Sequence, residues 1–244
     1  FNPVDRVKVD KIINIIEYVP TEADFESVIS ATFRIGLDDE IRCMLIAVYE
    51  TGLRINEVLK WQIEEMDLNH PQYDAQGNLI FLPFFTTDIS KQGRIVRKRI
   101  PMSKKLWETM RLQVEERKSG YVFTRQTPPY RMLRWMYCPQ CKHRHFDHGN
   151  GNRTGKKYYP GDFCPSCKTG LLETRHLNQE AGVPYQRPFH DYRKSVKYRN
   201  KILKKLPKEL TKEFQGHATD SMDEYYLHLQ TNDLYAVVAD TWES

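Results

Sequence analysis

The stretch Thr51-Gly52-Leu53-Arg54-Ile55-Asn56-Glu57-Val58 joins two segments that both carry a helical pattern of apolar residues. The first segment starts near residue 38 or 39 and is predicted to end at Gly52, because glycine is favoured just after a helix terminus. The second is predicted to be a helix over residues 55–61, with Arg54 at its start and Glu57 on the same face. The stretch therefore predicts an arginine presented where two helices meet.

A second group of polar residues lies far downstream and has its own spacing. His190 and Arg193 are three positions apart in a segment predicted to be helical to about residue 203, so their side chains share one helix face. Further on, a Gly-His pair places His217 nine positions before Tyr226.

Each of these residues has an ordinary explanation when it is taken alone. An arginine after Gly-Leu can cap a helix end, a histidine at a helix start can cap it, and most tyrosines pack in cores. Together, two arginines, two histidines and a tyrosine can cleave a DNA phosphodiester without a metal. The guanidinium groups neutralise the non-bridging oxygens, and the tyrosine hydroxyl attacks phosphorus and stores the bond as a phosphotyrosine.

In order and spacing, these residues resemble the catalytic domain of the tyrosine recombinases, the phage-integrase family. The resemblance implies that Arg54 and Arg193 clamp the phosphate and that Glu57 orients Arg54. It implies that His190 donates to a phosphate oxygen or assists proton transfer, and that His217 contacts a non-bridging oxygen. Arginine suits the clamp because its planar donors match two oxygens, which lysine cannot copy.

The resemblance also selects the nucleophile from two neighbouring tyrosines. The family spacing from the Gly-His pair favours Tyr226, and its Tyr-Leu-His sequence is similar to the family's usual Tyr-x-His. Tyr225 is then expected to pack in the core.

A basic segment is expected to supply the general acid. Residues 79–82 and 95–100 are predicted to be strands flanking a turn at residues 91–93, which makes an antiparallel hairpin. By the resemblance, a hairpin lysine protonates the leaving 5′ oxygen; Lys91 fits that position, Lys98 is the alternative, and an inert solvated lysine is the third possibility. A solvated face or a DNA contact explains this cationic run equally well: Lys91, Arg94, Arg97, Lys98, Arg99, Lys104 and Lys105.

Four of the five cysteines form two Cys-x-x-Cys pairs, a pattern typical of a structural zinc ribbon. Disulfides or redox-active pairs are the alternatives; no signal peptide or thioredoxin-like pattern supports them. Between residues 138 and 168, six Lys or Arg stand against two Asp, and a zinc with four thiolates adds −2. DNA contact, protein docking and fold bracing by this insertion stay open. The predicted zinc ligands are Cys138, Cys141, Cys164 and Cys167.

The 244 residues, 40% of them hydrophobic, suffice for one sizeable core and a small appended module. The net charge of +5 is compatible with nucleic acid but does not require it. No apolar run approaches the roughly 20 residues of a membrane span, and no signal-peptide core is present. We therefore expect a cytoplasmic, nucleoid-associated protein without a membrane partner.

The expected fold class is α+β and mainly helical: a tyrosine-recombinase catalytic fold with a small antiparallel sheet and an inserted four-cysteine zinc ribbon. Residues 1–20 are expected to be a linker from an N-terminal core-binding domain that is missing here. Residues 21–244 are the expected catalytic domain, with the ribbon inserted at 135–173. Helices are also expected over 104–118 and from a cap at Thr21, the latter with a buried face of Phe25, Val28, Ile29 and Phe33. The tail, residues 233–242, is amphipathic and is expected to dock on this domain or a neighbouring protomer.

The resemblance implies a site-specific recombinase or integrase of a mobile genetic element, acting on double-stranded DNA as a homo-tetramer on paired sites. It leaves room for an accessory DNA-bending protein, and it implies structural zinc but no nucleotide and no catalytic metal. Two alternatives share the site: a type IB topoisomerase-like enzyme and a hairpin-forming resolvase. A non-catalytic zinc-ribbon DNA-binding regulator is the alternative from another class.

Overall fold

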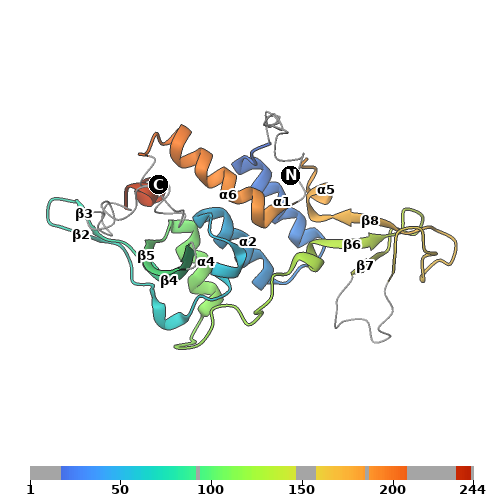
Figure 1. Cartoon of the computed structure of the whole chain (residues 1–244), viewed down its shortest axis with the longest axis horizontal. Helices are drawn as coiled ribbons and strands as arrows, with labels where there is room; N and C mark the ends of the chain where they lie inside the picture. Colours follow the sequence, from blue (N-terminus) through green and yellow to red (C-terminus); the bar gives the residue numbers. More distant parts are fainter. Residues whose placement is uncertain (1–17, 92–93, 147–157, 185–186, 208–234, 243–244) are drawn as a thin grey trace, which may run out of the picture.

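The computed structural model describes residues 18–91, 94–146, 158–184, 187–207 and 235–242. It is an α+β fold in which helices predominate over three small antiparallel sheets (Figure 1). The helices are α1 (Glu22–Arg34), α2 (Asp39–Thr51), α3 (Ile55–Val58), α4 (Lys104–Val114), α5 (Leu177–Ala181), α6 (Pro188–Tyr198) and α9 (Tyr235–Val238). The strands are β1 (Met66–Asp67), β2 (Gln72–Tyr73), β3 (Leu79–Phe81), β4 (Phe84–Lys91), β5 (Arg94–Pro101), β6 (Arg134–Tyr137), β7 (Arg144–Phe146) and β8 (Glu173–His176).

The helix α2 lies at the centre of the body and packs against α1, α4 and α6. Aromatic rings fill the junction of α1, α2 and α6. The rings of Phe25 and Tyr49 stack at 3.8 Å, and Tyr192 meets Phe25 edge-on at 5.4 Å. Such ring pairs add to the stabilisation from apolar burial. They fix α6, the helix with His190 and Arg193, against the helix that precedes Arg54.

Local capping signals set the start of α1 and both ends of α2 as predicted. Thr21 and Asp24 form a reciprocal capping box at the start of α1. Asp38 caps α2, which ends at Gly52 with a left-handed φ of 67°. The predicted buried face of α1 is wrong at one position, because Phe33 is 63% exposed and lies under the Arg42 guanidinium.

Two helices are shorter than predicted. α3 ends at Val58 rather than at residue 61. α4 starts after its predicted cap, Ser103, but ends at Val114, where Glu115 takes a left-handed φ of 51°. The Arg117 side chain donates to the carbonyl oxygens of Gln113, Val114, Tyr121 and Val122. The bonds to Gln113 and Val114 satisfy terminal carbonyls of α4 that continuation of the helix to residue 118 would otherwise bond.

The hairpin exists, but its first strand is not the predicted one. β4 pairs with β5 around residues 92–93, and β1 extends this sheet on the other side of β4. The run at 79–82 instead gives β3, which pairs with β2. Pro83 separates β3 from β4; its carbonyl accepts from Met102, but proline has no N–H with which to continue a ladder.

The cysteine pairs belong to a third sheet, in the order β7-β6-β8, which projects from one end of the helical body (Figure 1). We call residues 134–176 the ribbon. β8 leads into α5 without an intervening residue, and Arg144 on β7 forms an ion pair of 3.2 Å with Glu180 on α5. The ribbon is therefore joined to the body at α5, which packs against α1.

The C-terminal tail packs against its own chain. Val237 and Val238 are buried, and the Trp242 indole N–H donates to the Met102 carbonyl at 3.0 Å. The Trp242 ring also lies 5.3 Å from that of Trp107 on α4. The tail thus covers the surface between β5 and α4. Among the described residues, no helix has the length and apolar character needed to cross a bilayer.

Candidate active site and metal centre

Glu57 joins the two arginines of the predicted clamp. Its carboxylate accepts from the Arg54 side chain at 3.0 Å and from the Arg54 backbone N–H at 2.7 Å. Oε2 of this carboxylate, which accepts the Arg54 backbone N–H, also lies 3.7 Å from Nη1 of Arg193. Arg54 precedes α3 and Arg193 lies on α6, so the fold brings together two cations that are far apart in sequence.

The two arginines differ in their exposure to solvent. The Arg193 and Glu57 side chains are 11% and 8% exposed, whereas that of Arg54 is 57% exposed. Burial lowers the pKa of Arg193 to about 10, an effect that Glu57 opposes and Arg54 reinforces. Arg193 remains protonated near neutral pH, so the site presents one exposed and one mostly buried cation that share a single carboxylate.

His190 lies one helical turn before Arg193 on α6, as predicted. Its side chain is exposed, and its backbone N–H donates to the carbonyl of Arg187 at 2.9 Å. Pro188 opens this helix, where its missing N–H costs no helical bond. The imidazole is thus available at the surface on the helix that carries the second arginine.

The two candidate lysines occupy different positions in the hairpin. Lys91 is the last residue of β4 and pairs with Arg94 across the turn; its side chain lies outside the described structure. Lys98 lies opposite Thr87 in the sheet and is 6% exposed. Lys91 therefore stands at the hairpin tip, and Lys98 is enclosed in the body.

The predicted nucleophile and the second histidine cannot be placed. His217, Tyr226 and the neighbouring Tyr225 all lie outside the described residues. Their roles stay predictions.

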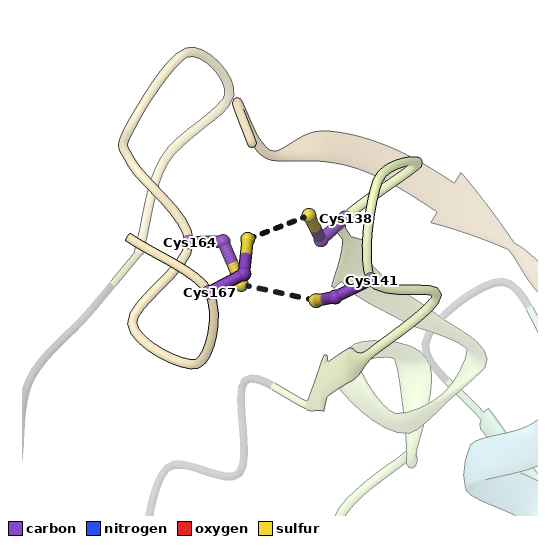
Figure 2. A group of neighbouring side chains, drawn as sticks. All are labelled: Cys138, Cys141, Cys164 and Cys167. Atoms are coloured by element: carbon purple, nitrogen blue, oxygen red, sulfur yellow. Dashed lines mark hydrogen bonds between the residues drawn. The ribbon is translucent and has the colours of Figure 1, made fainter. Parts of the chain in front are cut away.

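The four predicted zinc ligands come together at the end of the ribbon (Figure 2). Their sulfur atoms all lie within 4.8 Å of one another, with Cys138 and Cys167 at 3.7 Å and Cys141 and Cys164 at 3.6 Å. Both separations are far longer than a disulfide bond of about 2.05 Å. They match the sulfur–sulfur edge of about 3.8 Å that follows from tetrahedral zinc with Zn–S bonds of about 2.3 Å. The donor set therefore fits a tetrahedral, thiolate-bound metal ion.

The protein also stabilises thiolates in this cluster. Backbone N–H groups of Thr169 and Gly170 lower the pKa of Cys167 to about 6. The backbone N–H of His143 acts in the same direction on Cys141, but burial and hydrogen bonds to the other three thiols raise its pKa to about 12. Backbone donors on the second loop thus favour the thiolate form, and a divalent cation would stabilise all four thiolates.

Two residues near the cluster were not singled out from sequence. A Cβ on Gly170 would lie 2.4 Å from Sγ of Cys138, so the sulfur occupies space that only glycine leaves open. His145 on β7 places Nε2 3.4 Å from Sγ of Cys164. The position of Gly170, three residues after Cys167, was a usable signal; the approach of His145 depends on the pairing of β6 with β7 and had none.

No family model matches the chain, and no curated protein matches it. The solved structures to which the chain is similar include XerA recombinase, at a TM-score of 0.44 and 14% identity over 93% of this chain and 66% of that one. They include a lambda integrase dimer bound to a COC′ core site, at 0.44 and 14% over 86% and 60%. XerH site-specific recombinase bound to a palindromic difH substrate matches at 0.47 and 15% over 97% and 56%. The chain thus spans between about half and two thirds of these chains.

Proposed function

We propose that the chain is the catalytic domain of a tyrosine site-specific recombinase that cleaves and rejoins DNA through a 3′-phosphotyrosyl intermediate. The observation that supports it best is the pair Arg54 and Arg193, held together by Glu57. If Arg54 only capped α3, its contact with Glu57 would be sufficient. The mostly buried Arg193 on the same carboxylate is instead expected for a preformed anion-binding site.

The arginine pair would bind the scissile phosphate through its non-bridging oxygens. Charge builds on these oxygens as the attacking group approaches, so fixed cations stabilise the transition state more than the ground state. Glu57 keeps the guanidinium groups oriented in the absence of DNA, which reduces the reorganisation needed when phosphate binds. The exposed Arg54 offers the first contact, and Arg193 lies deeper.

In the proposed reaction the Tyr226 hydroxyl gives its proton to His190 or to solvent, and its oxygen attacks phosphorus. A bond forms between phosphorus and the tyrosine oxygen, and the bond from phosphorus to the 5′ oxygen breaks. Lys91 would give the leaving oxygen its proton, and His190 and His217 would bind phosphate oxygens or assist proton transfer. A 5′ hydroxyl from another strand then reverses the step, so no nucleotide cofactor is needed.

The cysteine cluster would hold one structural zinc ion. Four thiolates fill a tetrahedral shell and leave no open position for water or phosphate, so the ion would support the ribbon rather than the chemistry. The zinc ion would supply a cross-link between the two halves of the ribbon. The arginines, and not the zinc ion, would supply the positive charge for phosphoryl transfer.

The proposed partner is double-stranded DNA. We propose that the active assembly is a homo-tetramer on two recombination sites, with room for an accessory DNA-bending protein. Residues 21–244 would be the catalytic domain, with the zinc-binding insertion at 135–173, after a linker from an N-terminal core-binding domain.

A nicked duplex tests this function. The nick lets the short 5′-hydroxyl strand diffuse away after cleavage and traps the protein on DNA, which a denaturing gel resolves. We expect an adduct with the unaltered chain and a large loss of adduct with Arg193→Lys, which keeps the charge but loses the forked geometry. A regulator without catalysis would bind the duplex and form no adduct. Relaxation of supercoiled DNA without strand exchange would indicate a topoisomerase.

A further inference from the structure

The two metal-binding loops of the ribbon end in the same unusual way. Each has the sequence Cys-x-x-Cys-Lys, and the lysines, Lys142 and Lys168, have left-handed φ angles of 60° and 65°. Each lysine N–H donates to the carbonyl of the first cysteine of its loop at 2.9 Å. Both side chains are exposed. The loops are therefore equivalent in backbone as well as in ligands.

This backbone conformation disfavours lysine. A Cβ in the left-handed region crowds the neighbouring backbone, which is why glycine is the usual residue there. The hydrogen bond at each position comes from the main chain, so glycine would keep it. The loop geometry does not explain a lysine at either position, and a strained residue that recurs at equivalent sites points to a use for its side chain.

The two lysines differ from two arginines of the ribbon in their ion pairing. Arg144 is paired with Glu180, and Arg175 is paired with Glu173. Within the described part of the chain, neither Lys142 nor Lys168 forms an ion pair. Two exposed ammonium groups thus lie at the metal-binding end of the ribbon with no ion-pair partner among the described residues.

An apolar surface accompanies them on the second loop. Phe163 and Leu171 form an isolated antiparallel bridge, so their side chains project from the same side. They are 67% and 53% exposed, while their neighbours Cys164 and Leu172 are buried on the other side. Tyr159, just before them, is 60% exposed. The exposed pair Phe163 and Leu171 on one side of a small loop is typical of a contact surface.

We propose that this end of the ribbon is a second DNA-binding surface, in which Lys142 and Lys168 bind backbone phosphates and the Phe163–Leu171 pair packs on sugars or bases. The proposal rests on the proposed function for its ligand. Charge complementarity favours DNA, since the two exposed lysines lie on the same metal-binding loops as an exposed apolar pair, and the whole chain carries +5. The ribbon projects beyond the helical body (Figure 1). It would therefore contact a different stretch of DNA from the one bound by the arginine clamp.

The test uses the zinc-loaded chain and a mixed-sequence duplex. Lys142→Gly/Lys168→Gly removes both charges at positions where glycine relieves backbone strain, so the ribbon should stay folded and keep its metal. We expect affinity to fall several-fold and the slope of log K against log salt to shrink by about 2, since each phosphate contact contributes about 0.9. Lys142→Arg/Lys168→Arg keeps the charge and should keep the slope.

A crosslinking arm tests where the contact lies. Phe163→p-benzoylphenylalanine should crosslink to the duplex on illumination, whereas the same change at Leu112, which is 75% exposed on α4, should not. Equal crosslinking at both positions, or an unchanged salt slope in the double glycine variant, would overturn the proposal. Weaker metal binding with unchanged DNA affinity in that variant would also overturn it and assign the lysines to the cluster. Selective capture of a protein at Phe163 in place of DNA would do the same.

Failure of this inference is distinct from failure of the proposed function. If the unaltered chain binds DNA and forms the covalent adduct, but the glycine variant matches it, only the ribbon contact is wrong. If the unaltered chain binds no DNA, the proposed function fails, and the ribbon contact fails with it.

Discussion

Glu57 and Arg193 lie within 3.7 Å of each other, and neither side chain is more than 11% exposed. A buried ion pair of this kind contributes little net stability, but removal of one partner leaves an uncompensated charge. Since Glu57 also bonds to Arg54, its carboxylate contacts both candidate clamp residues.

Glu57→Gln should therefore impair cleavage and stability together. We expect adduct formation on a nicked duplex to slow by about 10- to 100-fold, because both guanidinium groups lose the group that orients them. The free energy of unfolding in urea should fall by about 2–4 kcal/mol, because Arg193 keeps its charge in a desolvated position. Glu57→Asp, which keeps the charge, should lose less of both. Wild-type cleavage in the glutamine variant would show that the arginines orient independently.

Lys91 should act as the acid for the leaving oxygen. Lys91→Ala is expected to slow cleavage of ordinary DNA, and a substrate with a 5′ thiol leaving group should restore the rate, since a thiolate needs no proton. Lys98→Ala is the matched comparison, and because Lys98 is 6% exposed, its loss should lower stability. Rescue of Lys98→Ala, and not of Lys91→Ala, would reassign the acid.

The chain should bind about one zinc ion, and Gly170→Ala should weaken that binding. The added methyl group would overlap Sγ of Cys138, so the ligands cannot close around the ion without a backbone shift. We expect affinity in a chelator competition to fall on the order of 10- to 100-fold. Ser166→Ala, an exposed change within the second loop, is the control. A Gly170→Ala chain with unchanged affinity would mean that the cluster is looser than the structure shows.

Removal of zinc should leave phosphoryl transfer intact while the body stays folded. Brief chelation, checked by circular dichroism, is expected to change cleavage of a nicked duplex little, because the arginines supply the cationic charge. A folded, metal-free chain that regains cleavage only after metal is added would assign the ion to catalysis.

The C-terminal tail should stabilise its own chain. Trp242→Ala removes a hydrogen bond to Met102 and the packing on Trp107, so stability should fall by about 2 kcal/mol. The loss should not vary with protein concentration. A loss that grows as the protein is concentrated would indicate docking on a neighbouring protomer.

The start of α1 and both ends of α2 could be predicted from sequence because their signals are local. The cap at Thr21, the cap at Asp38 and the stop at Gly52 each depend on residues within one turn. The end of α4 could not, because it follows from the contacts of Arg117 with four carbonyl groups. The hairpin was placed correctly at its turn, but its first strand was assigned to the wrong apolar run, since pairing partners are not local.

The candidate site divides in the same way. The cysteine cluster was predictable because Cys-x-x-Cys spacing itself dictates a shared ion. The contact of Glu57 with Arg193 was not, since it depends on α6 packing against α2, which follows from burial of Phe25, Tyr49 and Tyr192. The sequence identifies candidate residues for both sites, but only the fold shows that one carboxylate contacts both arginines.

Covalent attachment of DNA to Tyr226 tests the central claim most directly. A nicked duplex labelled on the strand that keeps its 3′ phosphate is incubated with the chain, and the adduct is digested and mapped by mass spectrometry. We expect the label on the peptide containing Tyr226, no adduct from Tyr226→Phe despite retained DNA binding, and a normal adduct from Tyr225→Phe. An undiminished adduct from Tyr226→Phe would contradict the assigned nucleophile, and no adduct from the unaltered chain bound to the nicked duplex would contradict the recombinase itself.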